Sequence, residues 1–176
     1  PEPVIKRARS LGPEGEAWLM ALPDVVNELS DAWGFAAGKV LAGGSEALVV
    51  ETLRDGEASI LKVGLPGSAD LATEARVYRA AAGRGYARLY AHSETHNALL
   101  LERLGLPLAE RGFDAAEELE RLCETLATAW QAPPDTLQGL VMTGAQKSRW
   151  LIDFIESTWR EQGEPCAREI IDRAIG

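Results

Sequence analysis

The sequence has few cysteines and fewer basic than acidic residues. Two cysteines among 176 residues are too few for a disulfide framework, which predicts a reducing, cytoplasmic environment. Lys and Arg number 18 against 27 Asp and Glu, giving a formal net charge of −9 at pH 7. Nucleic-acid recognition needs clustered Lys and Arg, so the acidic balance argues against a nucleic-acid partner.

Long apolar runs are also lacking. None approaches the roughly 18–20 residues of a membrane-spanning helix, which argues against a membrane protein. The start, Pro1-Glu2-Pro3, lacks the basic and apolar regions of a signal peptide. The 46% hydrophobic content is nevertheless ample for a core and excludes wholesale disorder. A chain of this length suits one domain, or one lobe with part of another.

The first part of the chain, up to residue 104, predicts helices followed by short strands. Residues 14–33 have the apolar spacing of one or two helices broken at Pro23, with Gly34 as the stop. Residues 39–63 predict a strand, a glycine-rich turn, a strand, a second turn and a third strand.

The second of these turns, Arg54-Asp55-Gly56-Glu57, carries a strong hairpin signal. If its loop has two residues, Val49 lies opposite Lys62 and Glu51 opposite Ile60. Because side chains alternate along a strand, Val49, Ile60 and Lys62 then share one face of the sheet.

Residues 68–83 predict a helix inserted into this sheet. Ser68 can cap it, Asp70 suits its first turn and Gly83 can end it. Glu74 falls on its apolar stripe. Two further strands are expected at 88–92 and 98–102.

After Gly105 the pattern is helical, with helices expected over 114–131, 145–162 and 165–175. Asp114 and Glu117 have the spacing of a capping box, and Pro133-Pro134 should end the first of these helices. Cys123 lies on the apolar stripe of that helix, which predicts a core residue rather than a nucleophile.

A lysine inside an apolar strand is the first feature that suggests chemistry. Burying Lys62 is costly without an opposite charge, and Glu74 lies twelve residues on, on the right face to supply it. The glycine-rich turn, with Gly43, Gly44 and Ser45, lies at one end of the strand that pairs with Lys62. Its backbone N–H groups could cradle phosphates that Lys62 also reaches.

Each of these features has a simpler interpretation. Gly43-Gly44 alone is typical of any tight turn, Lys62 could protect a sheet edge, and Glu74 could be a solvated helix charge. Their combination in this order is harder to explain that way.

An apolar pocket next to the lysine would complete a nucleotide site. Val49 and Ile60 could form a roof over an adenine ring, and the strand end at Glu102–Leu104 could offer backbone groups to the ring's edge. These are the working parts of a kinase-like nucleotide lobe.

The sequence also resembles a family, over roughly residues 14–175. The resembling stretches are Trp18-Leu19-Met20-Ala21-Leu22-Pro23, Ala42-Gly43-Gly44-Ser45-Glu46-Ala47-Leu48-Val49, Ile60-Leu61-Lys62-Val63, Glu74-Ala75, Leu99-Leu100-Leu101-Glu102-Arg103-Leu104 and Leu126-Ala127-Thr128-Ala129-Trp130-Gln131-Ala132-Pro133. They are similar to the aminoglycoside phosphotransferases, nearest the streptomycin 6-kinase or aminoglycoside/hydroxyurea resistance kinase branch. Each motif alone is weak, and their order and spacing carry the resemblance.

The resemblance implies an α+β, protein-kinase-like fold, and phosphoryl transfer from ATP with Mg to a hydroxyl of a small, aminoglycoside-like antibiotic. It would put Gly43, Gly44 and Ser45 over the phosphates and pair Lys62 with Glu74. It would line the adenine pocket with Val49, Ile60, Leu101 and Leu104, with Glu102 at its edge.

The family's catalytic loop, H-x-D-x-x-x-x-N, and its later metal-binding Asp are not found in these 176 residues. The histidines, His92 and His96, and the asparagines, Asn27 and Asn97, all precede residue 98. We therefore expect a nucleotide-binding lobe at 1–104, and at 105–176 the start of a helical lobe cut before the catalytic loop. No catalytic or metal-binding residue is expected in this chain, which should be inactive alone.

Two other functions stay open. The first is a non-catalytic α+β binding module with the shape of a kinase lobe, and the second, less supported by the helical segment, is a protein kinase. A small-molecule substrate is expected, such as a cationic aminoglycoside suited to the negative charge. Exposed apolar helix faces would favour self-association.

Overall fold

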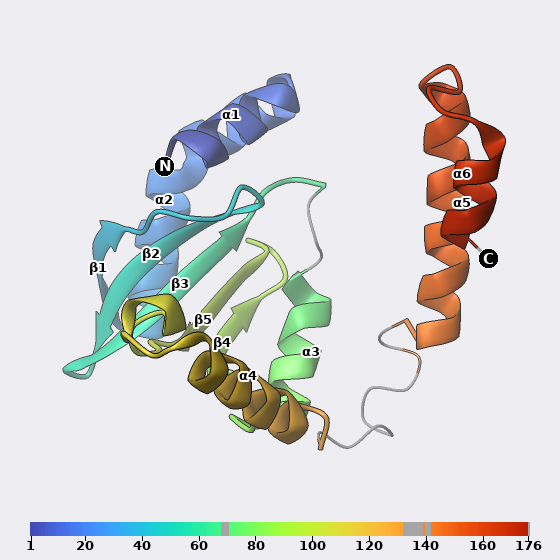
Figure 1. Cartoon of the computed structure of the whole chain (residues 1–176). Helices are drawn as coiled ribbons and strands as arrows, with labels where there is room; N and C mark the ends of the chain where they lie inside the picture. The colour runs from blue at the N-terminus through green and yellow to red at the C-terminus, as the bar shows by residue number, and fades with distance from the viewer. Residues whose placement is uncertain (68–70, 132–138, 140–141, 176) are drawn as a thin grey trace. The chain divides into compact units, whose positions relative to one another are not determined.

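The computed structural model describes residues 1–67, 71–131, 139 and 142–175. The chain divides into two compact units, Pro1–Leu137 and Gln138–Gly176, and each is described by itself (Figure 1). The first unit holds the sheet and helices α1 to α4; the second holds α5 and α6. The expected division into 1–104 and 105–176 stays a prediction.

The first unit is built around a five-stranded antiparallel sheet, in the order β1-β2-β3-β5-β4. Its strands are β1 (Phe35–Val40), β2 (Ala47–Arg54), β3 (Glu57–Gly64), β4 (Leu89–Ser93) and β5 (Ala98–Glu102). Helix α3 (Leu71–Ala81) is inserted between β3 and β4. The α+β prediction, with one helix inserted into a small antiparallel sheet, is confirmed.

The β2–β3 hairpin has the predicted register. Val49 pairs with Lys62 and Glu51 with Ile60, around a two-residue loop of Asp55 and Gly56. Both loop residues have positive φ, 52° and 82°, as a type I′ turn requires. Only a residue tolerant of the left-handed region fits such a turn, which is why the Asp-Gly pair fixes the register.

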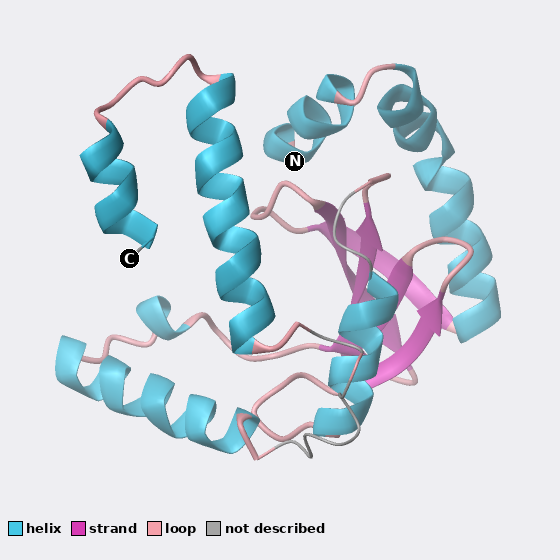
Figure 2. Cartoon of the chain, turned by 90° about the vertical axis from the view of Figure 1, so that its right-hand side faces the viewer, coloured by secondary structure: helices cyan, strands magenta, loops and turns pink. Residues whose placement is uncertain are grey.

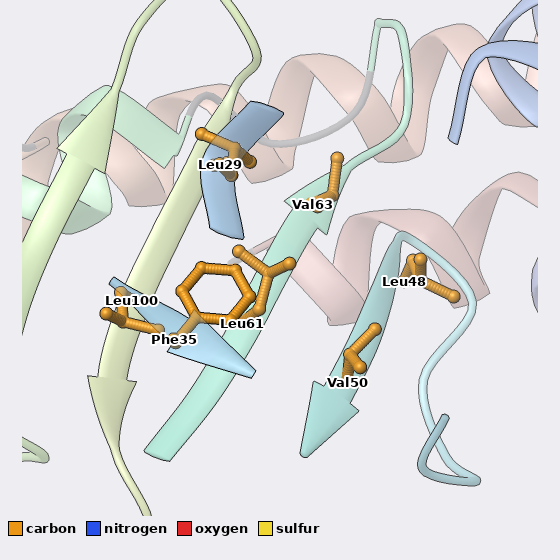
Figure 3. Packing of buried hydrophobic residues seen from close by; sticks show 8 residues of the cluster. Leu29, Phe35, Leu48, Val50, Leu61, Val63 and Leu100 are labelled. Atoms are coloured by element: carbon orange, nitrogen blue, oxygen red, sulfur yellow. The ribbon is translucent and has the colours of Figure 1, made fainter. Parts of the chain in front are cut away.

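One face of the sheet packs against helix α2 (Pro13–Trp33) (Figures 1 and 2). Figure 3 shows the centre of this core, where Leu29 of the helix lies with side chains of β1, β2, β3 and β5. The buried members of this core are Leu29, Phe35, Leu48, Val50, Leu61, Val63, Ala98 and Leu100. Thr52 and Ser59, directly opposite each other and buried, share a 2.7 Å hydrogen bond, so each of these two buried hydroxyls has a partner.

The other face of the sheet is covered in part by α3. Leu71 and Ala75 of the helix are buried against Leu99 and Leu101 of β5. Ile60, Tyr78 and Leu89 pack around them. This face carries Lys62, since its strand partners Val49 and Leu99 lie on the same side.

The structure differs from the predictions at the N-terminus. Helix α2 is continuous through Pro23, which is exposed, and ends as expected at Gly34 in the left-handed conformation. A helix that was not predicted, α1 (Glu2–Ser10), precedes it and buries Val4 and Ala8. The two helices approach so closely that a Cβ on Gly15 would lie 1.8 Å from the carbonyl oxygen of Ala8.

The described part of α3 agrees with the predicted helix. The proposed cap Ser68 and first-turn Asp70 lie outside the described residues. The helix ends at Ala81, two residues before the expected stop at Gly83, and both Ala82 and Gly83 have positive φ.

Helix α4 (Ala115–Ala129) begins with the predicted capping box. The carboxylate of Asp114 accepts hydrogen bonds from the N–H groups of Ala116 and Glu117, and Glu117 accepts from the N–H of Asp114. A short 3-10 helix, η1 (Leu108–Glu110), precedes it. Pro133 and Pro134, predicted to end this helix, lie outside the described residues.

The prediction that Cys123 is a core residue is wrong. Cys123 is exposed, and so is the apolar stripe around it. The exposed members of the stripe are Leu119, Leu122, Leu126 and Trp130. Helical spacing identified this face correctly but could not show whether anything covers it.

The second unit is a helical hairpin of α5 (Gly144–Glu161) and α6 (Arg168–Ile175). Thr143 and Gln146 form a capping box at the start of α5. Helix α6 begins at Arg168, three residues after the predicted start at Pro165. The indole N–H of Trp159 donates to the carbonyl of Cys166 at 2.9 Å, and Arg168 pairs with Glu156 across the hairpin. Among the described helices of both units, none is long and apolar enough to cross a membrane.

Candidate functional site

Lys62 and Glu74 form a two-pronged ion pair on the face of the sheet that α3 partly covers. The Nζ of Lys62 donates to Oε2 of Glu74 at 2.7 Å and to Oε1 at 2.9 Å. The side chains are 26% and 32% exposed. Both side chains are therefore largely out of water, although about a quarter of the Lys62 side chain remains exposed. The geometry expected from the sequence is present.

The hairpin register orients Lys62, and the apolar side of α3 orients Glu74. The hairpin register turns Lys62 toward α3. Glu74 precedes the buried Ala75, and one turn further on lies Tyr78. The pKa of Tyr78 is raised, because its phenol is desolvated and because the charge of Glu74 disfavours a second anion.

A strip of apolar surface adjoins Lys62 on the same face. Val49 and Ile60 are half-buried, and Leu101, which pairs with Ile60, is 7% exposed. Leu104 lies past the end of β5 and is 58% exposed. Three of the four residues expected to line an adenine pocket thus share the sheet face of Lys62, although Leu101 is buried against α3. The fourth, Leu104, lies on the segment that follows β5.

The glycine-rich turn joins β1 to β2. Gly43 and Gly44 have φ of 113° and 66°, values that favour glycine, and open space surrounds both. Val49, opposite Lys62, is the third residue of the strand that follows, so turn and lysine lie toward the same end of β2. The Ser45 hydroxyl lies 3.4 Å from Oε1 of Glu46. An exposed turn of this kind has backbone N–H groups available to an anion.

Glu102, at the end of β5, links this strand end to Arg88 by two hydrogen bonds. Its N–H donates to the carbonyl of Arg88 at 2.8 Å, and its carboxylate accepts from the N–H of Arg88 at 3.0 Å. The backbone at the end of β5 is thereby fixed to the start of β4.

Sequence reasoning missed a cluster of charged residues on the same face. Oε1 of Glu51 accepts from Nε of Arg103 at 3.2 Å, and Oε2 lies 3.5 Å from Nζ of Lys39. The pKa of Glu51 is lowered, chiefly by the hydrogen bond from Arg103 and also by the charge of Lys39, against an opposing effect of desolvation. The predicted register already put Glu51 opposite Ile60, on the lysine's face, but no local pattern indicated Arg103 as its partner.

No metal site is found in the described part of the chain, where no three His, Cys, Asp or Glu side chains come together. His92 lies on β4 and His96 in the turn after it, where it contacts Glu28 at 3.2 Å.

Two comparisons relate this chain to known proteins. The family model described as aminoglycoside/hydroxyurea antibiotic resistance kinase matches residues 34–150. A streptomycin 6-kinase of Streptomyces glaucescens is 41% identical over 108 residues, 59% of this chain and 34% of that protein. A streptomycin 6-kinase of Streptomyces griseus is 38% identical over 98 residues, 55% of this chain and 32% of that protein.

The matched region includes the glycine-rich turn, Lys62, Glu74 and the end of β5. The aligned part spans about a third of the length of these relatives. Because the family model covers well over half of the chain, the chain belongs to the aminoglycoside/hydroxyurea antibiotic resistance kinase family.

Proposed function

We propose that residues 1–104 form the nucleotide-binding lobe of an ATP-dependent small-molecule phosphotransferase. One observation carries the proposal: the ammonium of Lys62 is held by both oxygens of Glu74 on a side chain that stays 26% exposed. A phosphate oxygen could take the remaining donor of this ammonium, since charge-assisted hydrogen bonds of this type are among the strongest in proteins.

The surrounding residues suit the rest of the nucleotide. The exposed N–H groups around Gly43, Gly44 and Ser45 would meet the phosphates. Val49, Ile60, Leu101 and Leu104 would hold the base by apolar contact, with Glu102 at its edge. Mg, when bound with ATP, would neutralise charge on the phosphates.

The acceptor is proposed to be a hydroxyl of an aminoglycoside-like molecule. The names of the relatives support this class, and the net charge of −9 would attract a polycation at long range. Such a reaction belongs in the cytoplasm, where ATP is available and where Cys123 and Cys166 stay reduced.

Binding, rather than turnover, is the test suited to this chain, because its 176 residues contain no H-x-D-x-x-x-x-N stretch. We expect ATP to bind the wild type, measured by calorimetry, and Lys62→Ala to lower the affinity about tenfold or more. Lys39→Ala is the matched control, since this lysine is 71% exposed and contacts Glu51 instead. Equal ATP affinity in the wild type and Lys62→Ala would overturn the proposal, as would no binding by either.

We also propose that the chain self-associates with a second copy through α4. Leu119, Leu122, Leu126 and Trp130 recur at helical spacing and are all exposed, with fractions from 48% to 79%. Such a stripe gains free energy when it leaves water, and an identical stripe on a second copy is a fitting cover.

A further inference from the structure

Arg103 makes hydrogen bonds that restrain the segment following β5. Nη1 of Arg103 donates to the carbonyl oxygen of Leu104 at 2.9 Å, while Nε of the same guanidinium donates to Oε1 of Glu51 at 3.2 Å. One planar group therefore joins the backbone after β5 to a side chain on β2, two strands away in the sheet.

Glu51 is well placed to anchor this bridge. Glu51 lies opposite Ile60 on β3, and Ile60 lies opposite Leu101 on β5. The three side chains therefore form one row across the sheet, on the face of Lys62, with the carboxylate at its β2 end. Both partners are only about one-third exposed, Arg103 at 34% and Glu51 at 30%. Partial burial weakens the screening that makes most surface ion pairs negligible.

A second attachment fixes the same segment from the other side. The N–H of Glu102 is held by the carbonyl of Arg88, and the carboxylate of Glu102 holds the N–H of Arg88 in return. The backbone is thus fixed at Glu102 and again at Leu104. These hydrogen bonds restrain the peptide groups between the two points.

We propose that Glu51 and Arg103 are positioning residues that fix the backbone of 102–104 for recognition of the base of the nucleotide. This inference rests on the proposed nucleotide site. A fixed edge binds a flat ring with less loss of conformational entropy than a mobile one, so the pair acts on affinity for the base and not for the phosphates. In the proposed site the phosphates are bound instead by Lys62 and by the glycine-rich turn between β1 and β2.

The chemistry requires arginine. Two donors of one rigid guanidinium reach two acceptors, whereas a lysine ammonium is a point charge on a flexible stem. Arg103→Lys keeps the charge but cannot hold the carboxylate and the carbonyl in the same fixed geometry. This substitution therefore separates a positioning role from a general electrostatic one.

The experiment compares ATP with inorganic tripolyphosphate, which carries the phosphates without the base. We expect Arg103→Lys, Arg103→Gln and Glu51→Gln each to weaken ATP binding about three- to tenfold and to leave tripolyphosphate within about twofold of wild type. Lys62→Ala should weaken both ligands. Lys39→Gln is the matched control, because it removes the other neighbour of Glu51 while leaving the bridge intact, and it should change neither.

The possible outcomes separate this inference from the proposed function. Unchanged ATP affinity in Arg103→Gln and Glu51→Gln, with wild-type ATP binding intact, overturns the positioning role alone. Equal loss of both ligands, with a lower melting temperature, assigns the pair to the fold and also overturns it. If the wild type binds neither ligand, the proposed function fails and the inference fails with it. Should Arg103→Gln not fold, Arg103→Lys and Glu51→Gln decide.

Discussion

Lys62 of β3 and Glu74 of α3 are joined by two hydrogen bonds of 2.7 and 2.9 Å, the shorter one to Oε2. The pair connects the sheet to the helix inserted into it. Truncating one partner leaves the other partly buried without its counter-charge, which costs more than losing both.

We therefore expect non-additive stability effects at this pair. Lys62→Met and Glu74→Gln should each destabilise the fold by about 1 kcal/mol, and the double variant by less than their sum. Urea unfolding of the four proteins measures the coupling. Strict additivity would show that the contact contributes nothing to the fold, and would leave only a role in binding.

The Lys62–Glu74 pair could be predicted from the sequence because each residue's orientation depends on a local pattern. The Asp55-Gly56 turn allows one register, and that register puts Lys62 on the same face as Val49 and Ile60. The apolar stripe of α3 then orients Glu74. The capping box of Asp114 and Glu117 was predictable for the same reason, since it depends on residues three positions apart.

Features that depend on tertiary packing were missed. Pro23 was expected to break α2, yet it faces solvent, and the residues around it, Leu22 and Val25, pack on the sheet and hold the helix together. Helix α1 was not predicted, although Val4, Ala8 and Leu11 have helical spacing; in the fold Val4 and Ala8 are buried beside Leu65. The bridge from Arg103 to Glu51 spans 52 positions in the chain, and no local pattern reports it.

Gly15 provides a test of the packing between α1 and α2. In a helix interior, Gly→Ala normally stabilises by about 0.5–1 kcal/mol. Here the added Cβ would meet the backbone of Ala8, which cannot move aside as a side chain would. We expect Gly15→Ala to destabilise by about 1–3 kcal/mol net and to expose the α1–α2 connection to proteases.

Glu14→Ala is the control for this substitution, because Glu14 is exposed on the same helix. It should leave both stability and the proteolysis pattern near those of wild type. A gain of stability in Gly15→Ala would contradict the close approach of the two helices.

Tyr78 should make the stability sensitive to alkaline pH. Its pKa is raised above the ordinary value of 10.0, chiefly by burial and next by the charge of Glu74. A group with a raised pKa in the folded state contributes stability that is present below the unfolded pKa and lost as the pH rises through the folded pKa. The melting temperature of the wild type should therefore fall above pH 10.

Tyr78→Phe has no such proton to lose. Its melting temperature should fall less steeply than that of wild type between pH 9 and 11, measured by thermal denaturation monitored by circular dichroism. Parallel curves for the two proteins would contradict a partly buried, protonated phenol at this position.

The exposed stripe of α4 should drive self-association. Leu122 and Leu126 are 51% and 48% exposed, and burying each against a second copy would contribute about 1 kcal/mol or more from apolar area alone. We expect the weight-average mass of the wild type in sedimentation equilibrium to rise above 19.0 kDa with concentration. The double substitution Leu122→Gln, Leu126→Gln should hold this mass at the monomer value without lowering the melting temperature, because neither side chain supports the core.

Met20→Gln is the matched control for this experiment. Met20 is 81% exposed on α2, away from the stripe, so its variant should associate as the wild type does. A wild type that stays monomeric throughout would show that the stripe does not bind a second copy.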